Sequence, residues 1–424
     1  MQSVVALIRS TMPLAAVLGV ASFERYEPPK LPAPEASQPA AKCSLRFVGQ
    51  KKLRLFEDQA AYIEPSAFAA NARTLFLAGN PNYVWTSGNR ASLEQRNKLF
   101  GAIVGGTTRP IPAPTASPEL LHDVRVAANA DGSWAVVFAE ADRADFRSSL
   151  ANKRYWFGIV RRGMWEGLTR LPGVEGKLRT LGATDVIDAN RELIFAVPVD
   201  YGFRSDVVVF RRTREGRWHT ETVGTNHVAY VDLSQLADQQ LALAVVRPDT
   251  LESNDRNSLF LYTYDGTTRR WAERRKLSKG GLQAVHEPRL RSLEGRIVTT
   301  WLESVPGASI RSARAQVSRA LTLGDQAFTV DPSAHQVEYL HTAAGDGIWI
   351  TQGPGSGGLS LRFYHNVDGQ AIRMFEMKSP FVGPLKVAIK DSNLVMVGPT
   401  AGEREGAPPV SSSFLEVELM CWSV

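Results

Sequence analysis

Three stretches of the sequence place a tryptophan in the same setting. They are GIVRRGMWEGLTRL (158–171), VVFRRTREGRWHTETV (208–223) and FLYTYDGTTRRWAERRKL (260–277). Two intervals of 53 residues separate Trp165, Trp218 and Trp271, and each tryptophan follows an apolar run and a polar turn. A fixed period near 50 residues, built from short strands, is the signature of a β-propeller with one four-stranded blade per repeat.

The inner half of this unit recurs along the whole chain. An alternating strand, a tight polar turn and an apolar strand follow one another seven times, and no long segment has helical periodicity. Six blades would leave one unit unassigned, so we predict an all-β, seven-bladed β-propeller of four-stranded antiparallel blades. The turns lie at 69–73, 128–132, 188–192, 236–240, 292–295, 343–347 and 390–393.

The last unit is incomplete, because the chain stops after its third strand, SFLEVELMC (413–421). The missing outer strand is present near the other end, in CSLRFVGQKKLRLFED (43–58). Pairing the two segments would close the propeller and remove its open sheet edges. Cys43 and Cys421, the two cysteines of the chain, then fall where a hairpin turn would otherwise lie. We predict a disulfide there; the alternative is two unrelated buried thiols.

The N-terminal segment has the layout of an export signal. Arg9 is followed by an apolar run and then by small residues, which predicts a signal peptide at 1–21, with an uncleaved anchor as the alternative. Residues 22–42 are rich in Pro and Ala and predict an extended linker, which leaves 43–424 for the propeller. Export places the protein in the periplasm or outside the cell, where disulfides persist.

The charge pattern argues against nucleic-acid binding. The net charge is +6, but the basic residues are scattered, and the densest stretch, RRWAERRK (269–276), suits a solvated outer strand. No haem-attachment or phosphate-binding motif is present, so no cofactor is predicted. The expected partner is a protein or a glycan on the face with the long loops. The propeller is expected to be monomeric, with membrane-complex association through the N-terminal segment.

Aligning the first strands of the units shows a second regularity. Four of the seven histidines fall in a single column, and acidic residues recur in the next column. First strands line the channel of a propeller, and the long loops between second and third strands gather at the same end, which is where propellers usually bind ligands. The candidate ligand-binding residues are Glu64, His122, Asp123, Asp185, His227, His286, Glu287, Arg289 and His335.

Two interpretations of this polar ring remain open. Imidazole and carboxylate groups together suit a ligand site or a metal site. Alternatively, a histidine and an acid at each strand start connect one blade to the next by hydrogen bonds. The connecting role is favoured because it would repeat in every blade. A single metal ion is favoured least, because histidines of separate blades would have to converge across a wide channel.

The strand starts HDVRV (122–126) and HEPRL (286–290), together with the turn NADGSW (129–134), resemble the sialidase-like, BNR-repeat group of propellers. The turn is similar to the group's Asp-box in Asp131, Gly132 and Trp134. It is one residue shorter, lacks the Ser and the Thr, and joins the first two strands where the box joins the outer two. The resemblance covers 43–424 as architecture.

The resemblance implies a glycan-acting enzyme, but this sequence departs from the group's site. Family sialidases use an arginine triad, a tyrosine–glutamate pair and an aspartate acid. Here Arg125 and Arg289 are the two arginines of first strands near the mouth, and no tyrosine–glutamate pair is identifiable. We therefore predict an exported, non-catalytic binding module or an accessory subunit of an envelope complex, with no catalytic residues assigned. The alternative is a sialidase-like hydrolase or lyase with its site at the mouth of the channel.

Overall fold

The structure is a computed structural model that separates the chain into two units, Met1–Ala41 and Lys42–Val424. The predicted leader (1–21) and the predicted linker up to residue 41 lie outside the described residues. Within the described part, no helix is long and apolar enough to cross a membrane. The structure describes residues 42–53, 61–62, 67–70, 75–79, 83–86, 89–90, 100–104, 109–112, 120–129, 131–141, 153–173, 177–178, 185–189, 192–201, 204–225, 227–228, 230–236, 240–248, 257–266, 268–278, 284–293, 296–304, 311–319, 327–341, 347–367, 370–383, 385–390, 393–400 and 411–422.

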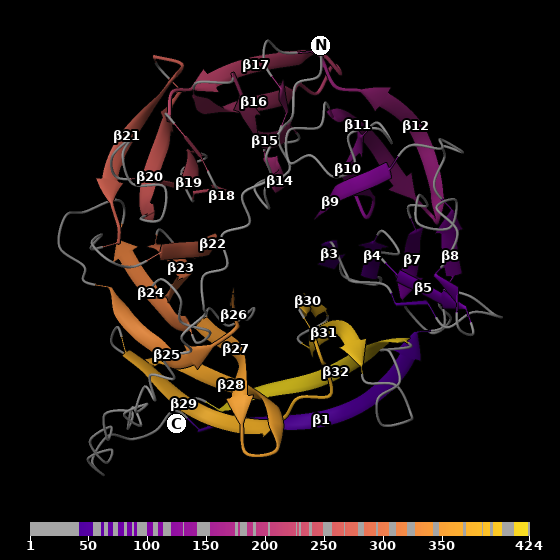
Figure 1. Ribbon diagram of the computed structural model, residues 1–424, viewed down its shortest axis with the longest axis vertical. Coiled ribbons are helices and arrows are strands. Elements are labelled where there is room, and N and C mark those ends of the chain that lie inside the picture. The colour runs from indigo at the N-terminus through magenta and orange to yellow at the C-terminus, as the bar shows by residue number, and fades with distance from the viewer. Residues whose placement is uncertain are drawn as a thin grey trace, which may run out of the picture. The chain divides into compact units, whose positions relative to one another are not determined.

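Most of the described strands form seven antiparallel sheets, and none of the described residues is helical (Figure 1). The first sheet contains β3 (Ala67–Ala70), β4 (Leu75–Gly79), β7 (Phe100–Val104) and β8 (Arg109–Pro112). The second contains β9 (Leu120–Ala128), β10 (Trp134–Ala141), β11 (Lys153–Arg161) and β12 (Met164–Arg170). The third contains β14 (Asp185–Ala189), β15 (Glu192–Asp200), β16 (Ser205–Arg212) and β17 (Trp218–Val223), with β13 (Lys177–Leu178) as a fifth strand beside β15.

The remaining sheets repeat this order. The fourth contains β18 (Tyr230–Gln235), β19 (Leu241–Pro248), β20 (Asn257–Asp265) and β21 (Arg270–Lys276). The fifth contains β22 (Ala284–Leu293), β23 (Arg296–Ser304), β24 (Arg311–Arg319) and β25 (Phe328–Ala334). The sixth contains β26 (Gln336–His341), β27 (Gly347–Gly355), β28 (Gly358–Val367) and β29 (Gln370–Lys378). The seventh contains β30 (Lys386–Lys390), β31 (Asn393–Thr400), β32 (Ser411–Trp422) and β1 (Lys42–Leu53). A small separate sheet contains β2 (Ala61–Tyr62), β5 (Tyr83–Thr86) and β6 (Asn89–Arg90).

The first strand of each sheet, here called its inner strand, contacts the inner strands of the neighbouring sheets. The contacts run from β3 to β9, β14, β18, β22, β26 and β30, and from β30 back to β3. In Figure 1 these strands lie nearest the centre of the unit, and the later strands of each sheet lie farther out. The all-β fold predicted from the sequence is therefore confirmed, and the arrangement is consistent with a propeller.

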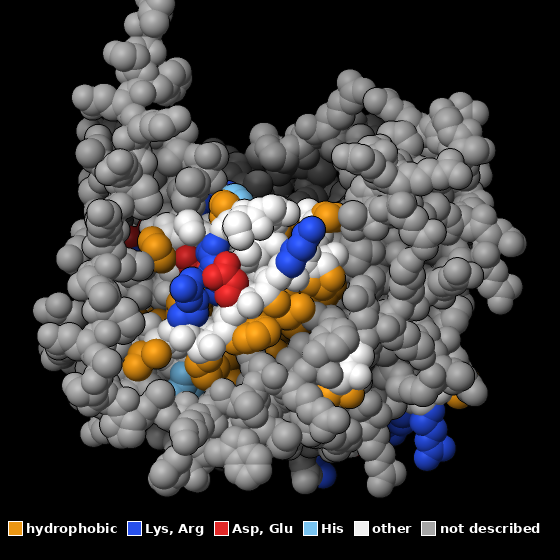
Figure 2. All heavy atoms as spheres, turned by 90° about the horizontal axis from the view of Figure 1, so that it is seen from below, with side chains coloured by type: hydrophobic (Ala, Val, Ile, Leu, Met, Phe, Trp, Pro, Cys, Tyr) orange, Lys and Arg blue, Asp and Glu red, His pale blue; other side chains and the backbone are white. Residues whose placement is uncertain are grey.

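The hydrophobic core lies between consecutive sheets. One cluster of buried side chains joins Val209 of β16 to Val231 and Leu243 of the next sheet, and similar clusters join other consecutive pairs of sheets. Burial falls toward the outermost strand: most of β27 is buried, whereas β29 exposes Ile372 and Phe375. In the side view of Figure 2, hydrophobic side chains lie at the surface among basic and acidic ones.

The repeated tryptophans lie at the first or second position of the outer strands β12, β17 and β21, as the period predicts. Trp218 meets Phe157 of the preceding sheet edge to face, with ring centroids 5.8 Å apart. Trp271 donates its indole N–H to Glu221 of the preceding sheet at 3.1 Å. These two tryptophans thus connect an outer strand to the sheet before it, whereas Trp165 packs against Phe138 of its own sheet.

The turn that resembles an Asp-box joins β9 to β10 and is stabilised by hydrogen bonds to Asp131. The Asp131 carboxylate accepts hydrogen bonds from the Ser133 backbone N–H at 2.9 Å, the Ser133 hydroxyl at 2.6 Å and Arg161 at 2.7 Å. These contacts, led by the Ser133 hydroxyl, hold the pKa of Asp131 below its ordinary value. Gly132 adopts a φ of 83°, which glycine tolerates without steric cost. This aspartate stabilises a turn and is not needed to explain binding.

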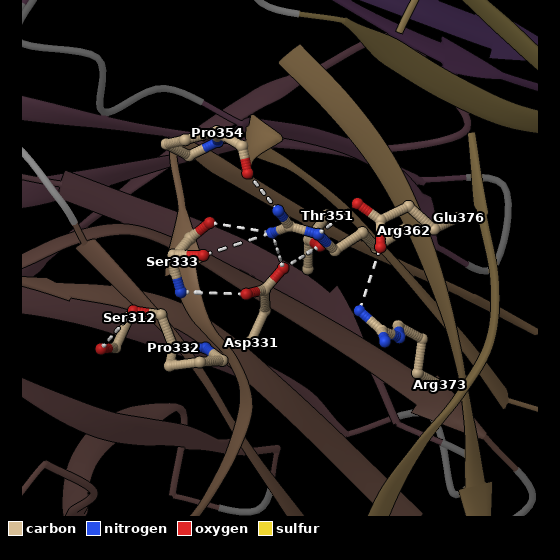
Figure 3. Close-up of polar contacts among 9 residues, drawn as sticks. All are labelled: Ser312, Asp331, Pro332, Ser333, Thr351, Pro354, Arg362, Arg373 and Glu376. Carbon is tan, nitrogen blue, oxygen red and sulfur yellow. Dashed lines mark hydrogen bonds and ion pairs between the residues drawn. The ribbon is translucent and has the colours of Figure 1, made fainter. Parts of the chain in front are cut away.

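A buried ion pair connects the fifth sheet to the sixth (Figure 3). Arg362 on β28 contacts Asp331 on β25 at 3.0 Å, and their side chains are 9% and 2% exposed. Thr351 donates to the same carboxylate at 2.5 Å, the Ser333 backbone N–H donates at 2.9 Å, and Glu376 accepts from Arg362 at 3.2 Å. Every charge in this network therefore has a partner, as burial requires.

Replacing Arg362 by Met should lower the free energy of unfolding by about 3–5 kcal/mol, because it leaves Asp331 buried without its counter-ion. Chemical denaturation measures the change. Arg373, which is 58% exposed and pairs with Glu376 at 3.0 Å, is the matched control. Its replacement by Met should cost less than about 1 kcal/mol. Equal losses in the two variants would show that the network does not hold the sheets together.

The two ends of the described chain pair in the seventh sheet. Strand β1 runs antiparallel to β32, and the register places Cys43 directly opposite Cys421. Directly opposed residues in an antiparallel ladder have Cα atoms about 4.5–5.5 Å apart, within the roughly 4.4–6.8 Å that a disulfide spans. The predicted pairing of these strands is confirmed, and the backbone register supports the predicted disulfide.

Intact mass after alkylation without a reductant tests the disulfide. We expect no alkylation until a reductant is added. Replacing Cys43 and Cys421 together by Ser should lower the free energy of unfolding by about 2–4 kcal/mol, since the bridge would close nearly the whole chain. Alkylation of both thiols in the untreated protein would refute the bridge.

Candidate functional site

Two predicted site residues, His286 and Glu287, lie on a bulge near the start of β22. His286 is opposite Leu302 and Arg289 is opposite Thr300, so two residues of β22 face one residue of β23. Glu287 has a φ of 47°, a left-handed conformation that costs energy for any residue other than glycine. A bulge redirects side chains and is common beside functional sites. The inner strand β9 has the same interruption between His122 and Arg125.

The imidazole of His286 lies between a hydroxyl and an aromatic ring. Its Nε2 is 3.0 Å from the Ser304 hydroxyl at the end of β23. The ring of Tyr230, at the start of β18, meets it edge to face, with centroids 6.3 Å apart. Burial, and then the guanidinium of Arg311, hold the pKa of His286 below its ordinary value, against the opposing effect of Glu287. The imidazole is therefore neutral at neutral pH.

The carboxylate of Glu287 pairs with Arg311, the first residue of β24, at 3.5 Å. Burial, and then Glu287, raise the pKa of Tyr230. The phenol therefore keeps its proton at neutral pH. We call Tyr230, His286, Glu287, Ser304 and Arg311 the His286 cluster; it brings a neutral base, a protonated phenol and an ion pair together.

A second cluster lies on neighbouring inner strands. Arg289 on β22 is 3.9 Å from Asp232 of β18 and 3.6 Å from Glu338 of β26, so it bridges two sheets. Asp232 also accepts from the Leu290 backbone N–H at 2.5 Å and from Arg291 at 3.4 Å. Both carboxylates are more than nine-tenths buried. Their charges are already balanced by guanidinium groups.

Gln336 and Lys386 complete this second cluster. The Gln336 amide donates to Glu338 at 3.1 Å and accepts from the Leu385 backbone N–H at 2.8 Å, which fixes the start of β30. Burial, and then Arg289, lower the pKa of Lys386 to about 8, and Arg125 of β9 acts in the same direction. We call Arg125, Asp232, Arg289, Arg291, Gln336, Glu338 and Lys386 the Lys386 cluster.

The other predicted residues lie elsewhere. His227 precedes β18 with a φ of 69°, and its backbone N–H donates to Ser205 at 2.8 Å. His335 precedes β26, is exposed, and uses its backbone N–H on Gln352 at 2.6 Å. The roles of their rings remain predictions, because the hydrogen bonds that fix these positions come from the backbone.

The remaining candidates fall wholly or partly outside the description. Glu64 lies outside the described residues. His122 and Asp123 are on β9 and Asp185 is on β14, but their side chains lie outside the described part. Among the side chains that the structure describes, no group of three His, Cys, Asp or Glu residues is arranged to hold a metal ion.

Sequence reasoning missed Tyr230, Arg311, Glu338 and Lys386. Tyr230 lies three positions after His227, and Glu338 lies three positions after His335. The alignment of inner strands compared only the histidine column and the column after it, so it did not include these two residues. Lys386 was present in the acidic column as its single basic member. Arg311 begins a third strand and reaches the cluster only through the fold. The available signal was that Lys386 is basic in a column of seven positions of which four are acidic.

Comparison with known proteins gives a fold but no family. No protein-family model matches the sequence, and no curated protein matches it significantly. Among solved structures, the polysaccharide lyase Uly1 is similar with a TM-score of 0.56 at 12% identity, covering 88% of this chain and 99% of that chain. A polysaccharide lyase of family PL25, an ulvan lyase bound to -[GlcA(1-4)Rha3S]-, has a TM-score of 0.54 at 8% identity, covering 89% and 94%.

A protein of unknown function from Dyadobacter fermentans is similar to the same extent, with a TM-score of 0.54 at 11% identity, covering 89% of this chain and 99% of that chain. At these identities the likeness shows the fold alone. It agrees with the sialidase-like resemblance at the level of architecture, while the BNR repeat remains a prediction.

The lowered pKa of His286 predicts a dependence of stability on pH. The unfolded chain binds a proton at the ordinary pKa of 6.5, whereas the folded protein resists protonation to a lower pH. Stability from this group is therefore present above that value and is lost as the pH falls below it. Between about pH 7.5 and about pH 5, the melting temperature should fall less in His286→Gln than in the unmodified protein. His219→Gln, at an exposed position of β17, should behave like the unmodified protein.

Proposed function

We propose that this chain is a glycan-acting enzyme whose reaction takes place at the His286 cluster. The observation that carries the proposal is the contact between a neutral imidazole and a protonated phenol beside an ion pair on a strained bulge. Groups with opposite proton-transfer tasks and perturbed pKa values are typical of active sites. Similarity in fold to polysaccharide lyases supports a glycan as the substrate class.

The scaffold proposed for this site is an exported, seven-bladed propeller. The cycle of contacts from β3 through the inner strands back to β3 supports seven blades. Pairing of β1 with β32 supports closure by the two ends of the chain. In such a propeller the His286 cluster lies at the starts of inner strands, where long loops gather.

The solved neighbours favour an enzyme over the non-catalytic module expected from the sequence. Three structures with TM-scores above 0.5 are of polysaccharide lyases. The sequence argument for a module was that the arginine triad and the tyrosine–glutamate pair of family sialidases are not identifiable. In the described sheets, polar contacts between inner strands include those of Asp232, Arg289, Glu338 and Gln336.

Elimination fits the His286 cluster better than hydrolysis. Glycoside hydrolysis uses two carboxyl groups about 5–10 Å apart. The one carboxylate of this cluster, Glu287, is held by Arg311. Elimination in a uronic-acid glycan needs a base for the proton on the carbon beside the carboxyl group and an acid for the leaving oxygen. His286 and Tyr230 provide these two groups.

The proposed reaction assigns one step to each residue. His286, kept neutral by burial and by Arg311, accepts the proton from the carbon next to the uronate carboxyl group. The electron pair of that C–H bond forms a carbon–carbon double bond, and the glycosidic C–O bond breaks. Tyr230, kept protonated by burial and by Glu287, gives its proton to the leaving oxygen. Ser304 holds the imidazole in position.

A panel of uronic-acid and neutral polysaccharides tests the proposal. Elimination creates a conjugated double bond, so turnover should appear as new ultraviolet absorbance together with new reducing ends. Tyr230→Phe and His286→Ala should each lower kcat by about 10²–10⁴-fold. Reducing ends without the absorbance would indicate hydrolysis and would exclude the elimination mechanism.

Tyr262→Phe provides the matched control. This tyrosine is buried on β20 and donates to Glu273 at 3.0 Å, away from the His286 cluster. Its variant should keep full turnover on the substrate that the unmodified protein cleaves. If the unmodified protein binds a glycan without cleaving it, the enzyme proposal is wrong and the protein is a recognition module.

A further inference from the structure

The turns that join the third and fourth strands of the second, third and fourth sheets are rich in arginine. These turns lie at 161–165, 211–218 and 265–271. They contain eight arginines, no lysine and two acidic residues. Adding the turns between the first and second strands of the same sheets gives nine arginines and six acidic residues. Because these counts come from the whole sequence, positive charge exceeds negative charge there whichever side chains the structure describes.

All three turns lie at the same end of the unit. Strands within a sheet run antiparallel, so the end of a third strand lies beside the end of the first strand and far from its start. In the second sheet, for example, Trp134 is opposite both Ala128 at the end of β9 and Val160 near the end of β11. The arginine-rich turns are therefore at the opposite end from the His286 cluster. Figure 1 shows the outer strands β12, β17 and β21 following one another along the outer edge.

Two arginines of the third sheet reach the sheets on either side. The guanidinium of Arg212 lies over the ring of Phe157 in the second sheet, 5.1 Å from its centroid. The guanidinium of Arg211 lies over the ring of Tyr264 in the fourth sheet, 4.6 Å from its centroid. These contacts connect the three turns into one surface.

Four arginines of these turns are exposed, and no described carboxylate lies within ion-pair distance of them. They are Arg162, Arg214, Arg269 and Arg270. The described carboxylates beside them pair with other arginines, in the pairs Asp131–Arg161, Glu192–Arg211 and Glu215–Arg217. The exposed guanidinium groups are therefore available to a partner.

Two of the four occupy strained backbone positions. Arg162 has a φ of 52° and Arg269 has a φ of 53°, in the left-handed region that costs energy for a residue other than glycine. Arg162 is followed by Gly163, whose φ is 83°, in a tight hairpin turn where asparagine or glycine would be the less strained choice. An arginine at such a position is explained better by what its side chain binds than by the backbone it must adopt.

We infer that these turns bind an acidic polysaccharide through an arginine band, composed of Arg162, Arg211, Arg212, Arg214, Arg269 and Arg270. Planar guanidinium groups bind carboxylate and sulfate groups through paired charge-assisted hydrogen bonds, which an ammonium cannot form. Repetition of the arginines on three consecutive sheets suits a polymer with repeated negative charges. The band lies away from the His286 cluster and does not depend on the proposed reaction.

Nucleic acid and an anionic membrane fit the arginine band less well. Stacking on bases needs exposed aromatic faces. However, Trp218 packs edge to face on Phe157, and Trp271 is half-buried beside Tyr264. A membrane surface needs several apolar side chains that insert beside the basic ones. In the described residues of these turns, Met164 is the one large apolar side chain that is exposed.

Dextran sulfate and unmodified dextran of equal length are the probes, because they differ only in their sulfate groups. Binding of the full chain to each immobilised polymer is measured by biolayer interferometry over a range of salt concentrations. The protein should bind dextran sulfate with an affinity that falls as salt rises, and it should not bind dextran. Equal binding to the two polymers would overturn the inference.

A triple variant tests the arginine band itself. It combines Arg162→Gln, Arg214→Gln and Arg270→Gln, three exposed positions on three sheets. Loss of three charge-assisted contacts should weaken binding to dextran sulfate by at least about tenfold. The melting temperature should stay close to that of the unmodified protein, because the side chains are exposed.

The matched control removes the same charge elsewhere. It combines Arg170→Gln, Arg373→Gln and Lys378→Gln, at exposed positions of β12 and β29 outside the three turns. This variant should bind dextran sulfate like the unmodified protein. Equal weakening in the two triple variants would show that overall charge binds the polymer, and would exclude the arginine band.

Two other polyanions complete the test. Single-stranded DNA or phosphatidylglycerol vesicles that bind more tightly than dextran sulfate, at equal concentrations of negative charge, would contradict a polysaccharide partner. None of these measurements uses turnover. A protein that binds dextran sulfate through the band but cleaves no glycan would refute the proposed reaction alone, whereas cleavage without such binding would refute the band alone.

Discussion

The hydrogen bond from the Leu290 backbone N–H to the Asp232 carboxylate connects the inner strand of the fifth sheet to the inner strand of the fourth. Inner strands lie beside one another without a shared hydrogen-bond ladder, so their position along the axis must come from side chains. Asp232 provides one such contact. Arg289 pairs with Asp232 and also with Glu338 of the sixth sheet. Gln336, on the same strand as Glu338, accepts a hydrogen bond from the Leu385 backbone N–H beside the seventh sheet. Four consecutive inner strands are thereby held by one connected set of polar contacts.

Both clusters depend on this constraint. Leu290 is four residues after His286, and the bulge between them sets the directions of the imidazole and of Glu287. Loss of the Asp232 contact would leave a buried carboxylate near two arginines and would free the start of β22 to shift. Such a shift would move His286 and Glu287, because both lie on the same strand as Leu290. The strain of Glu287 persists because the surrounding contacts determine it.

Features set by local sequence patterns could be predicted, whereas contacts between side chains far apart in the chain could not. The tryptophan period and the turn signals are local patterns, and they predicted the strands, the outer position of Trp218 and the pairing of β1 with β32. Sequence spacing also predicted that Cys43 faces Cys421, because a hairpin without its turn leaves one place for both. The column of histidines was a real regularity, but it identified positions and not partners. His286 gains its chemistry from Tyr230, 56 residues earlier, and from Arg311 on a third strand.

Glu287 links the two clusters electrostatically. Its carboxylate raises the pKa of Tyr230 in one cluster and that of Lys386 in the other, while Arg311 opposes it at Tyr230. Glu287 therefore couples the protonation of Tyr230 in one cluster to that of Lys386 in the other.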